Sequence, residues 1–497
     1  MYWANFLHIY QPAEQQPDIL EAIVNQSYRP ILLGLKKHKR ARLTFNINGA
    51  LLELFDKYKY YDLIDNLREL GEEGRVEFTS SAKYHAFLPF LEEEEIVRQI
   101  KINNETCQFF LGKAYQPKGF FPPEMAYHEK LVKIVENLGF EWMILDEIAC
   151  TGKVEEVDYK KIYQIKGSKL KVFFRERRIS NLIMSAVVRS RESLVEAMKN
   201  DFKSGRYLIT AMDGETFGHH RPGLEKLLFE IFESPEFNLI KISEISNYYK
   251  NIEEVTPIRS TWASSQEDIE KNIQFLSWSD PENIIHHWQW DFLKLVLDEV
   301  HKMDRNSNLY PIVRKKMDIA LASDQFWWAS AKPWWSLEMI EDGAYKLLDT
   351  IRTIPNISKD KLEKASNYYE KIVSTAFEWQ RGGKIREMTK EQKSVLRIPF
   401  KDRTFTKGGE EKGVYYAFID MMKKLEKEAA KKREYEKAIL WRDAIYKLQH
   451  KLDVYDMINA IDLLRVEIPH KEVEETIEKY KGKYRQIRGG QPEQRGR

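Results

Sequence analysis

Short apolar runs, each ending at a polar tip and followed by a helical pattern, recur through the first half of this 497-residue chain. Strands buried on both faces of a parallel sheet have such sequences, and a following amphipathic segment is typical of a βα unit. Seven stretches fit the pattern: Tyr2 to Ile9, Ala41 to Ile47, Arg75 to Thr79, Gly119 to Phe121, Glu141 to Leu145, Leu170 to Phe174 and Tyr207 to Met212. We therefore predict an α/β fold in which residues 1–255 form a distorted, TIM-like, seven-stranded (β/α) barrel.

From about Thr256 the apolar spacing changes to that of long helices. The helical stretches are Asp291 to Met303, Tyr310 to Ala322, Met339 to Ile354 and Lys359 to Trp379. We predict that residues 256–400 form an α-helical domain that packs on the barrel and completes its active site.

Residues 401–497 predict a helical C-terminal extension. The basic, glycine-containing stretch 401–412 has the composition of a loop, and the tail 489–497 is too polar to order itself. Two helices are predicted between them, Val414 to Leu452 and Val454 to Leu464. We expect truncation after about Pro399 to leave the catalytic chemistry intact.

Polar side chains stand where the predicted strands end. In (β/α) barrels the functional groups gather at the carboxyl ends of the strands. The residues at these positions are His8, Asn46, Asn48, Glu77, Glu124, Asp146, Arg175 and Asp213. The sequence therefore predicts a polar, acid-rich barrel mouth.

The run from Leu208 to Met212 stops abruptly at two carboxylates, Asp213 and Glu215, which one glycine separates. A buried strand that delivers acids to its tip makes Asp213 a candidate catalytic residue. The alternative is that Asp-Gly is ordinary turn chemistry at a strand end.

Glu124 follows a short apolar strand and two prolines, whose fixed φ angles stiffen its backbone. A rigid carboxylate suits a nucleophile. The alternative is a glutamate at the amino end of the helix predicted over His128 to Leu138. If Glu124 and Asp213 face each other across a barrel mouth, one could attack as an anion while the other is held protonated by its surroundings as the general acid.

Histidines and tryptophans add further candidates. His8 ends the first predicted strand, although a lone histidine is often a structural hydrogen-bonding residue. The pairs His219-His220 and His286-His287 lack HxxxH or HExxH spacing, so we predict no metal site. Eight of the 12 tryptophans fall between Trp262 and Trp335, close to Asp324. Such rings either fill a helical core or stack on sugar faces, and we favour the sugar-binding interpretation.

Composition excludes several classes of protein. The chain has 79 Lys and Arg against 77 Asp and Glu, so no bulk polyanion such as nucleic acid is an expected partner. Cys107 and Cys150, the two cysteines, form neither a disulfide framework nor a CxxC site, which fits a reducing cytoplasm. No window approaches about 18 uninterrupted apolar residues, so no membrane span is expected.

Five separated motifs give the first 340 or so residues a resemblance to glycoside hydrolase family 57, a family of retaining enzymes active on α-glucans. The first is His8-Ile9-Tyr10-Gln11-Pro12, with Tyr10 where the family usually has a second histidine. The second runs from Val76-Glu77-Phe78 to Tyr84-His85, and the third is GFFPPEMAY around Glu124. The fourth is DGETFG from Asp213, and the fifth is Ala322-Ser323-Asp324-Gln325-Phe326-Trp327.

The resemblance implies roles for these residues. Glu124 would be the nucleophile and Asp213 the general acid/base. The residues expected to bind the sugar are His8, Tyr10, Glu77, Glu215, His220, Trp262, Asp324, Trp327 and Trp328. No metal or organic cofactor is implied.

The expected substrate is an α-glucan or maltooligosaccharide with α-1,4 bonds, cleaved by hydrolysis as in an amylase. A 4-α-glucanotransferase or an α-1,4-glucan branching enzyme of the same family is the alternative, since water or a sugar hydroxyl can complete the reaction. A catalytically weak glucan-binding scaffold is a second class. A metal-dependent polysaccharide deacetylase is a third, and it would require converging His and Asp ligands.

The extension carries a resemblance of its own. Residues 434–449 read EYEKAILWRDAIYKLQ, with apolar positions at helical spacing under dense alternating charge. Most such segments are solvated hairpin helices. This one resembles the helical hairpin that the repair proteins UvrB and UvrC use for protein contact, which implies a possible protein partner for residues 417–465.

Overall fold

The computed structural model describes residues 1–332, 334–391, 412–450, 454–469, 472–473, 475–477 and 479–480. The predicted domain boundary near residue 400, the predicted loop 401–412 apart from its last residue, and the tail 489–497 lie outside these residues.

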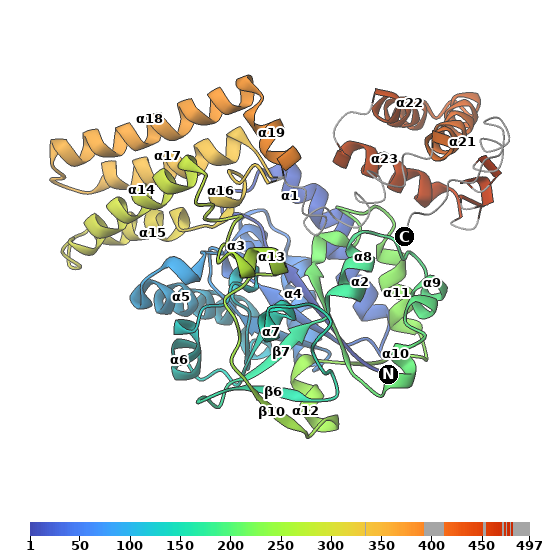
Figure 1. The fold of residues 1–497 in the computed structure, drawn as a ribbon, viewed down its shortest axis with the longest axis horizontal. Coiled ribbons are helices and arrows are strands. Elements are labelled where there is room, and N and C mark those ends of the chain that lie inside the picture. Colours follow the sequence, from blue (N-terminus) through green and yellow to red (C-terminus); the bar gives the residue numbers. More distant parts are fainter. Residues whose placement is uncertain are drawn as a thin grey trace.

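Seven parallel strands curl into the predicted barrel (Figure 1). They follow one another in the order β8-β1-β2-β3-β4-β5-β7. The backbone N–H of Glu176, just after β7, donates to the carbonyl of Ile209 in β8 at 2.9 Å and brings the two outer strands together. All seven predicted strands are confirmed: β1 (Tyr2–Ile9), β2 (Leu43–Ile47), β3 (Val76–Ser80), β4 (Gly119–Phe120), β5 (Trp142–Asp146), β7 (Lys171–Arg175) and β8 (Leu208–Asp213).

Three further strands were not predicted: β6 is mostly buried but only four residues long, β9 has three residues, and β10 is largely exposed. The strands β6 (Ile162–Ile165) and β10 (Ile252–Val255) extend the sheet beyond β7, where β6 runs antiparallel to β7 and β10 parallel to β6. The three-residue strand β9 (Asn238–Ile240) pairs with the start of β1. Three of the four residues of β10 are exposed, so periodicity carried no signal there.

Alternate residues of β1 serve two cores, as the period of two in a strand requires. Ala4 and Phe6 point into the barrel, where Phe6 lies 5.2 Å from Phe121 between ring centres. Trp3 and Leu7 point outward and pack beneath the surrounding helices. The strand is therefore buried on both faces, which explains its continuous apolar sequence.

Helices and short helical turns connect the strands of the barrel. They are α1 (Pro17–Ile23), η1 (Val24–Tyr28), α2 (Arg29–Lys37), α3 (Gly49–Lys57), α4 (Tyr61–Glu72), η2 (Leu88–Phe90), α5 (Glu93–Leu111), η3 (Gly112–Ala114), η4 (Pro123–Met125), α6 (Lys130–Asn137), α7 (Ile148–Thr151), α8 (Arg177–Met184), α9 (Arg191–Ala197), α10 (Asp201–Ser204), η5 (Gly214–Thr216), α11 (Glu225–Glu233), η6 (Ile242–Glu244) and α12 (Ile245–Tyr248).

The helical region after the barrel contains the predicted long helices. Its elements are α13 (Gln266–Glu270), α14 (Ile284–His301), α15 (Tyr310–Ala320), α16 (Asp324–Trp327), α17 (Leu337–Thr353), α18 (Lys359–Gly382) and α19 (Lys384–Glu391). Helix α14 begins seven residues earlier than predicted because the Asn283 side chain caps it, accepting from the N–H groups of Ile285 and His286.

A buried charge network joins these helices to the barrel. Arg314 of α15 pairs with Asp318 at 2.9 Å and with Glu95 of α5. Arg98 of α5 donates to Asp318 at 2.6 Å. The helical region is therefore attached to the barrel through α5.

In the described part of the extension the helices with defined bounds are α21 (Lys412–Lys431), α22 (Tyr435–His450) and α23 (Val454–Glu467). The prediction of one helix from Val414 to Leu452 was wrong, because the chain turns at Arg433, whose φ is +63°. Trp441 packs with Met422 and Ala444 in a small core of the extension's own. None of the described helices has a stretch long and apolar enough to cross a membrane.

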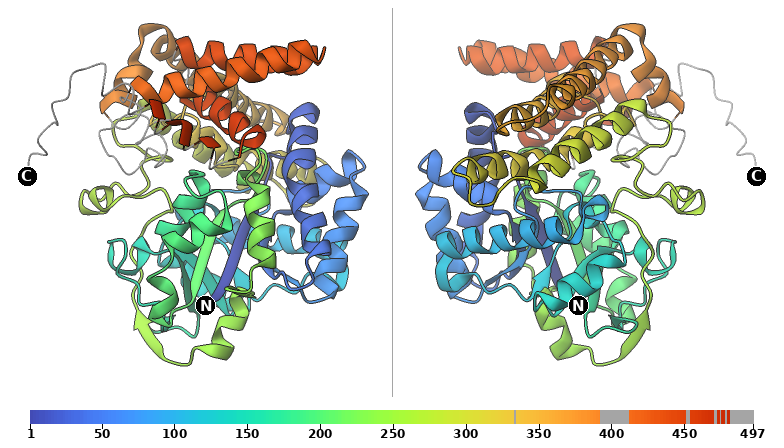
Figure 2. Two further views of the ribbon diagram at one scale, coloured as in Figure 1. Left: turned by 90° about the vertical axis from the view of Figure 1, so that its right-hand side faces the viewer. Right: turned by 90° about the vertical axis from the view of Figure 1, so that its left-hand side faces the viewer.

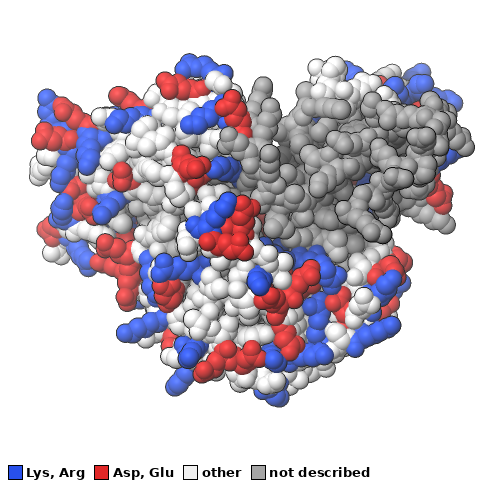
Figure 3. Space-filling model, in the orientation of Figure 1, with Lys and Arg blue, Asp and Glu red and all other residues white. Residues whose placement is uncertain are grey.

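Both the helical region and the extension lie at the end of the barrel opposite the N-terminus (Figure 2). Cationic and anionic side chains are interspersed over the described surface on the face shown in Figure 3. The end of the barrel that carries the strand tips is thus the end that the later segments approach.

Candidate active site

Glu124 sits in η4, directly after β4, on an uncommon backbone. Its φ is +62° and that of Met125 is +49°, values that residues other than glycine rarely adopt. The two preceding prolines and a hydrogen bond from the Met125 N–H to the Pro122 carbonyl at 2.8 Å hold the turn. Helix α6 begins only at Lys130, so Glu124 does not belong to its first turn and the helix-dipole alternative fails.

Trp262 holds Glu124 from a segment 138 residues further along the chain. The indole Nε1–H donates to Glu124 Oε2 at 2.7 Å, and the backbone N–H of Trp262 donates to the Glu124 carbonyl at 3.1 Å. The other carboxyl oxygen, Oε1, lies 3.7 Å from Nδ1 of His85. The carboxyl group is therefore oriented on one oxygen by a neutral donor.

Three rings stack beside this carboxyl group. The His85 ring lies 4.4 Å from Tyr10 and 5.0 Å from His8 between ring centres. His8 Nδ1 is 2.8 Å from Oδ1 of Asn46, whose amide nitrogen donates to Thr79. Since Asn46 presents its oxygen, His8 donates from Nδ1, and burial lowers its pKa to about 4. Neutral His8 therefore keeps Nε2 as a hydrogen-bond acceptor.

The helical region contributes Asp324 at the start of α16. Tyr10 donates its hydroxyl to Asp324 Oδ2 at 2.8 Å. The segment before α16 is attached to the loop after β3, because the Ser323 N–H donates to the His85 carbonyl at 3.2 Å and the Ser323 hydroxyl lies 3.1 Å from His85 Nδ1. Barrel and helical region thus build one site.

Asp213 and Glu215 enter the site from β8. Asp213 is the register partner of His8 on the neighbouring strand β1. Glu215 accepts hydrogen bonds from Gln11 Nε2 at 3.0 Å and from the Tyr28 hydroxyl. Glu215 is therefore held toward η1, whereas Asp213 ends the strand itself.

Burial and mutual repulsion change the acidity of these carboxyl groups. Burial, and then the charge of Asp213, raise the pKa of Glu124 to about 8, while the Trp262 hydrogen bond opposes the rise. Burial raises the pKa of Asp213 to about 6 against the charge of Arg175. Burial and Asp213 also raise the pKa of Glu215. These groups therefore share protons near neutral pH, as acid–base catalysis requires.

Other expected sugar-binding residues lie around this centre. Trp327 ends α16 and Trp328 follows it directly, and the Trp327 ring stacks on Trp334 with 4.3 Å between ring centres. These rings are half-buried. His220 lies on the loop after η5 with an exposed side chain, and its backbone N–H donates to the Glu215 carbonyl at 2.8 Å.

The structure does not bring Glu77 to this centre. Glu77 is the second residue of β3, so it lies toward the amino end of the strand. Its Oε1 accepts from the Thr44 hydroxyl at 2.7 Å and from the Ser243 N–H at 3.1 Å. Strand direction separates Glu77 from the tips that carry the other acids.

Several residues of the site were not among the expected ones. His85, Gln11 and Tyr28 contact the acidic groups, and Ser323 contacts His85. Gln11 and His85 fall inside the first two motifs, a signal that could have singled them out. Tyr28 lies in a helical turn with an ordinary amphipathic sequence and carried no signal.

His286, from one of the two histidine pairs, has its hydrogen-bond partners within the helical region. The His286 Nδ1 accepts from the Asp280 N–H at 3.0 Å and Nε2 lies 2.8 Å from the Phe326 carbonyl, so His286 belongs to the helical core. Among the residues described by the structure, no three His, Cys, Asp or Glu side chains are grouped to hold a metal ion.

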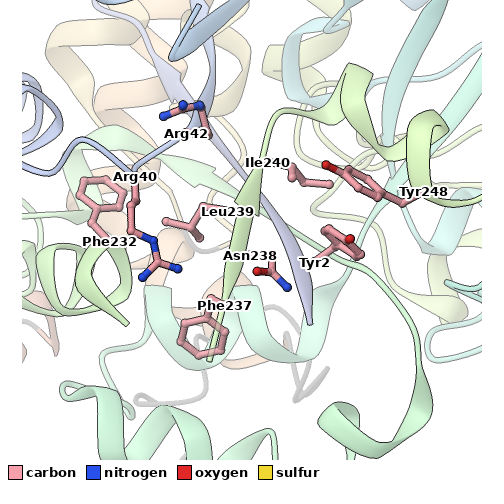
Figure 4. A pocket seen from close by; sticks show the side chains of 9 residues that line it. All are labelled: Tyr2, Arg40, Arg42, Phe232, Phe237, Asn238, Leu239, Ile240 and Tyr248. Atoms are coloured by element: carbon pink, nitrogen blue, oxygen red, sulfur yellow. The ribbon is translucent and has the colours of Figure 1, made fainter. Parts of the chain in front are cut away.

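A separate hollow of about 370 Å³ lies at the other end of the barrel, beside the first residues of β1 (Figure 4). Its described lining residues are Tyr2, Arg40, Arg42, Phe232, Phe237, Asn238, Leu239, Ile240 and Tyr248. This set includes no carboxyl side chain, so the hollow is not an extension of the acidic site.

Fold and site together define a (β/α)-barrel protein with buried carboxyl groups at the carboxyl ends of its strands, an arrangement suited to glycoside chemistry. Residues 6–259 match the sequence model of glycosyl hydrolase family 57. The chain belongs to this family, which confirms the resemblance carried by its motifs.

Relatives with different activities share this similarity. The "Alpha-amylase 1" of Dictyoglomus thermophilum is 25% identical over 265 residues, which cover 52% of this chain and 38% of that protein. The "4-alpha-glucanotransferase" of Thermococcus litoralis is 24% identical over 250 residues, covering 48% of this chain and 37% of that protein. The matched part thus spans well under half the length of these two curated relatives.

A solved structure shares the fold. The crystal structure of a GH57 branching enzyme from Thermococcus kodakaraensis superposes with a TM-score of 0.58 at 16% identity, covering 74% of this chain and 94% of that one. This similarity concerns the fold, a (β/α)7 barrel followed by helices.

Proposed function

We propose that the protein is a retaining glycosidase that acts on α-1,4 bonds of α-glucans, with Glu124 as nucleophile and Asp213 as general acid/base. The observation that carries the proposal is the Glu124 carboxyl group, oriented by Trp262 on a constrained strand tip and close enough to Asp213 for its charge to raise the pKa of Glu124. Membership of a glycosyl hydrolase family supports it.

The reaction needs two steps and one shuttled proton. Glu124 Oε1, the oxygen not held by Trp262, attacks the anomeric carbon while Asp213 gives its proton to the departing glycosidic oxygen. A covalent glycosyl-enzyme results. Asp213 then takes a proton from the incoming hydroxyl as that oxygen attacks the anomeric carbon and releases Glu124.

The ionisation order sets which form of the enzyme reacts. Burial raises the pKa of both Glu124 and Asp213, and the charge of Asp213 raises that of Glu124 further, so the pair keeps a proton to higher pH than free carboxyl groups would. The reactive form of the singly protonated pair is the one with the proton on Asp213. Trp262 favours that form, since its donated hydrogen bond stabilises the Glu124 anion.

Sugar binding is assigned to the groups around this pair. His8 offers Nε2 as an acceptor for a sugar hydroxyl. The hydrogen-bonded pair of Tyr10 and Asp324 offers further polar oxygens for sugar hydroxyls. Glu215 follows Asp213 by two residues, and the His220 backbone N–H donates to the Glu215 carbonyl. Trp327 and Trp328 present half-buried rings for stacking. Glu77 has no part in this proposal because Thr44 and Ser243 hold it near the amino end of β3.

Hydrolysis is our leading assignment, and transfer to another glucan is the alternative. Both kinds of name occur among the relatives. The choice depends on whether a sugar hydroxyl or water reaches the glycosyl-enzyme first.

Incubation of the purified protein with maltoheptaose separates these outcomes. Short sugars with a matching rise in reducing ends mean hydrolysis, whereas a ladder above the substrate at constant reducing ends means 4-α-glucan transfer. With amylose as a longer substrate, side chains that a debranching enzyme releases from the product would mean branching. Glu124→Gln and Asp213→Asn are the controls, and turnover that survives in both would overturn the assigned roles.

A glucan-binding scaffold is tested by the same variants. If wild type and Glu124→Gln bind amylose equally and neither turns over maltoheptaose or amylose, the scaffold interpretation replaces the enzyme one. Equal binding with turnover in wild type alone supports the glycosidase.

A further inference from the structure

The loop that follows the two acids of β8 is attached at several points. This loop, residues 217–224, begins after η5, which contains Glu215. Gly218 has a φ of +112° and passes so close to the Gln26 carbonyl that a Cβ there would lie 1.9 Å from the oxygen. His219 Nδ1 is 2.8 Å from Gln26 Oε1. One end of the loop is therefore fixed to η1 of the barrel.

The far end of the loop meets the C-terminal extension (Figure 1). Asp462 of α23, with a fully buried side chain, pairs with Arg189 at 3.0 Å and lies 4.0 Å from the Nε of Arg221 in the loop. Arg189 also donates to the Pro222 carbonyl at 2.6 Å. A Cβ at Gly223 would lie 2.7 Å from Val466 Cγ2, so α23 packs directly on the loop backbone.

The charges at this contact are unequal. Burial lowers the pKa of Arg189, and the positive charges of Arg465 and Arg221 lower it further, whereas Asp462 and then Glu225 act in the opposite direction. The carboxylate of Asp462 thus offsets repulsion among arginines that approach one another in a buried place. Loss of its charge leaves those arginines repelling each other, which favours separation of α23 from the loop.

We propose that the C-terminal extension positions the 217–224 loop through Asp462, and that it thereby shapes the glucan-binding side of the site. Asp462 is a positioning residue, since it acts on the loop and not on the reacting atoms. The effect on glucan binding rests on the proposed function. The proposal also refines the expectation for truncation after about Pro399: the acids themselves stay with the barrel, but the position of the 217–224 loop depends on α23.

The first experiment measures the loop directly, without substrate. Hydrogen exchange is followed by mass spectrometry on the full-length protein, comparing wild type with Asp462→Asn. Asp443→Asn is the matched control, because Asp443 is an exposed aspartate of α22 paired with its neighbour Arg442. We expect faster exchange in peptides covering 217–224 for Asp462→Asn, and wild-type exchange for Asp443→Asn and Asp462→Glu. Unchanged exchange in Asp462→Asn overturns the proposal whether or not the enzyme is active.

A second variant avoids the buried charge in case Asp462→Asn fails to fold. Val466 is 38% exposed, so Val466→Lys should be tolerated by the extension itself while it places a cation against Gly223 and near Arg189. The same local rise in exchange over 217–224 is expected. If this variant leaves the loop as protected as in wild type, α23 does not position it.

The kinetic experiment tests the consequence for the site. With amylose as substrate, Asp462→Asn should raise KM roughly tenfold at an unchanged kcat, the pattern of lost binding contacts, and Asp462→Glu should restore the wild-type KM. A fall in kcat at constant KM, or no kinetic change despite faster exchange, overturns the link between loop and glucan. If wild type itself shows no turnover, the proposed function fails while the exchange result still decides the positioning role.

Discussion

Glu124 owes its orientation to a backbone that few residues adopt. Left-handed backbone at a residue with a side chain costs roughly 1–2 kcal/mol, and here two consecutive residues adopt it. Two hydrogen bonds from Trp262, one to the side chain and one to the backbone carbonyl, hold the turn in place. Such strain at a strand tip is common at functional sites, where it fixes a reacting group before substrate arrives.

Replacement of Trp262 by phenylalanine tests this arrangement. Trp262→Phe keeps a ring but removes the donor to Glu124 Oε2. A hydrogen bond to a charged group contributes about 1.5–3 kcal/mol, so kcat should fall about 10- to 100-fold. Since the lost donor stabilised the anion, the pKa of Glu124 should rise, and the limb of the pH profile that it controls should move to higher pH.

Trp290→Phe is the matched control for that variant. Trp290 also donates its Nε1–H, to the Trp278 carbonyl at 2.9 Å, but within the helical region. Its loss should leave the pH profile unchanged. Equal shifts in the two variants would mean that the effect is general loosening and not the loss of a bond to Glu124.

The shared proton predicts the pH dependence of kcat/KM. Below a pH of about 6 both Asp213 and Glu124 are protonated, so the nucleophile is lost, and above about 8 both are ionised, so the acid is lost. The profile should be a bell with its maximum between these values. It is measured with maltoheptaose from pH 4 to 10 as a buffer series. An activity that rises continuously through pH 9 would contradict the assignment of a protonated acid.

At the scale of elements, buried charge fixes how the helical region sits on the barrel. Arg314 of α15 has a side chain 3% exposed and compensates Glu95 of α5 and Asp318. Arg314→Met keeps most of the side-chain volume but removes the positive charge beside those carboxylates. The free energy of unfolding should therefore fall by about 3–5 kcal/mol. The midpoint of denaturant unfolding measures the change.

Arg305→Met is the control for the same interface. Arg305 pairs with Glu94 at 2.8 Å, but its side chain is 70% exposed, and an exposed pair contributes about 0–1 kcal/mol. A similar loss in both variants would show that burial of the Arg314 pair is not what stabilises the attachment of α15 to α5.

Elements were predictable where burial left a pattern in the sequence. In β8 the five residues before Asp213 are all buried, because helices cover one face of the strand and the barrel interior covers the other. The strands β9 and β10 are short or exposed, so the same reasoning could not find them. The break at Arg433 follows a run of lysine and arginine with no glycine or proline, so nothing local marked the end of α21.

At the scale of the whole molecule, the site is shared between two packed parts of the chain. Tyr10 of the barrel and Asp324 of α16 meet across 314 residues of sequence. Tyr10→Phe removes the donor to a desolvated carboxylate and should lower the free energy of unfolding by about 1–2 kcal/mol. Burial already raises the pKa of Asp324 and the Tyr10 bond opposes that rise, so this pKa should increase further. Denaturant titration of wild type and Tyr10→Phe at pH 7 and at pH 5 measures this loss of unfolding free energy and its pH dependence. The loss should be smaller at pH 5, where more Asp324 is protonated.

Tyr369→Phe provides the comparison within one part of the chain. Tyr369 donates to Glu341 at 2.6 Å between α18 and α17, in a more exposed setting. Its loss should cost less and show no such pH dependence. If Tyr10→Phe is no more costly than this control, the barrel and the helical region do not depend on the Tyr10 contact.

The sequence by itself determined the parts whose physics is local. Burial on both faces gives the strands of the barrel their apolar runs, and chain order places Glu124 and Asp213 at strand ends, where a parallel barrel gathers its functional groups. Tertiary structure decided the rest, because Trp262 reaches Glu124, Tyr28 reaches Glu215 and Asp462 reaches Arg189 across long stretches of chain. Glu77 shows the opposite case: its motif suggested a place in the site, but it lies near the amino end of β3, away from the strand tips. Burial periodicity is visible in one segment, whereas a contact between segments exists only once the chain has folded.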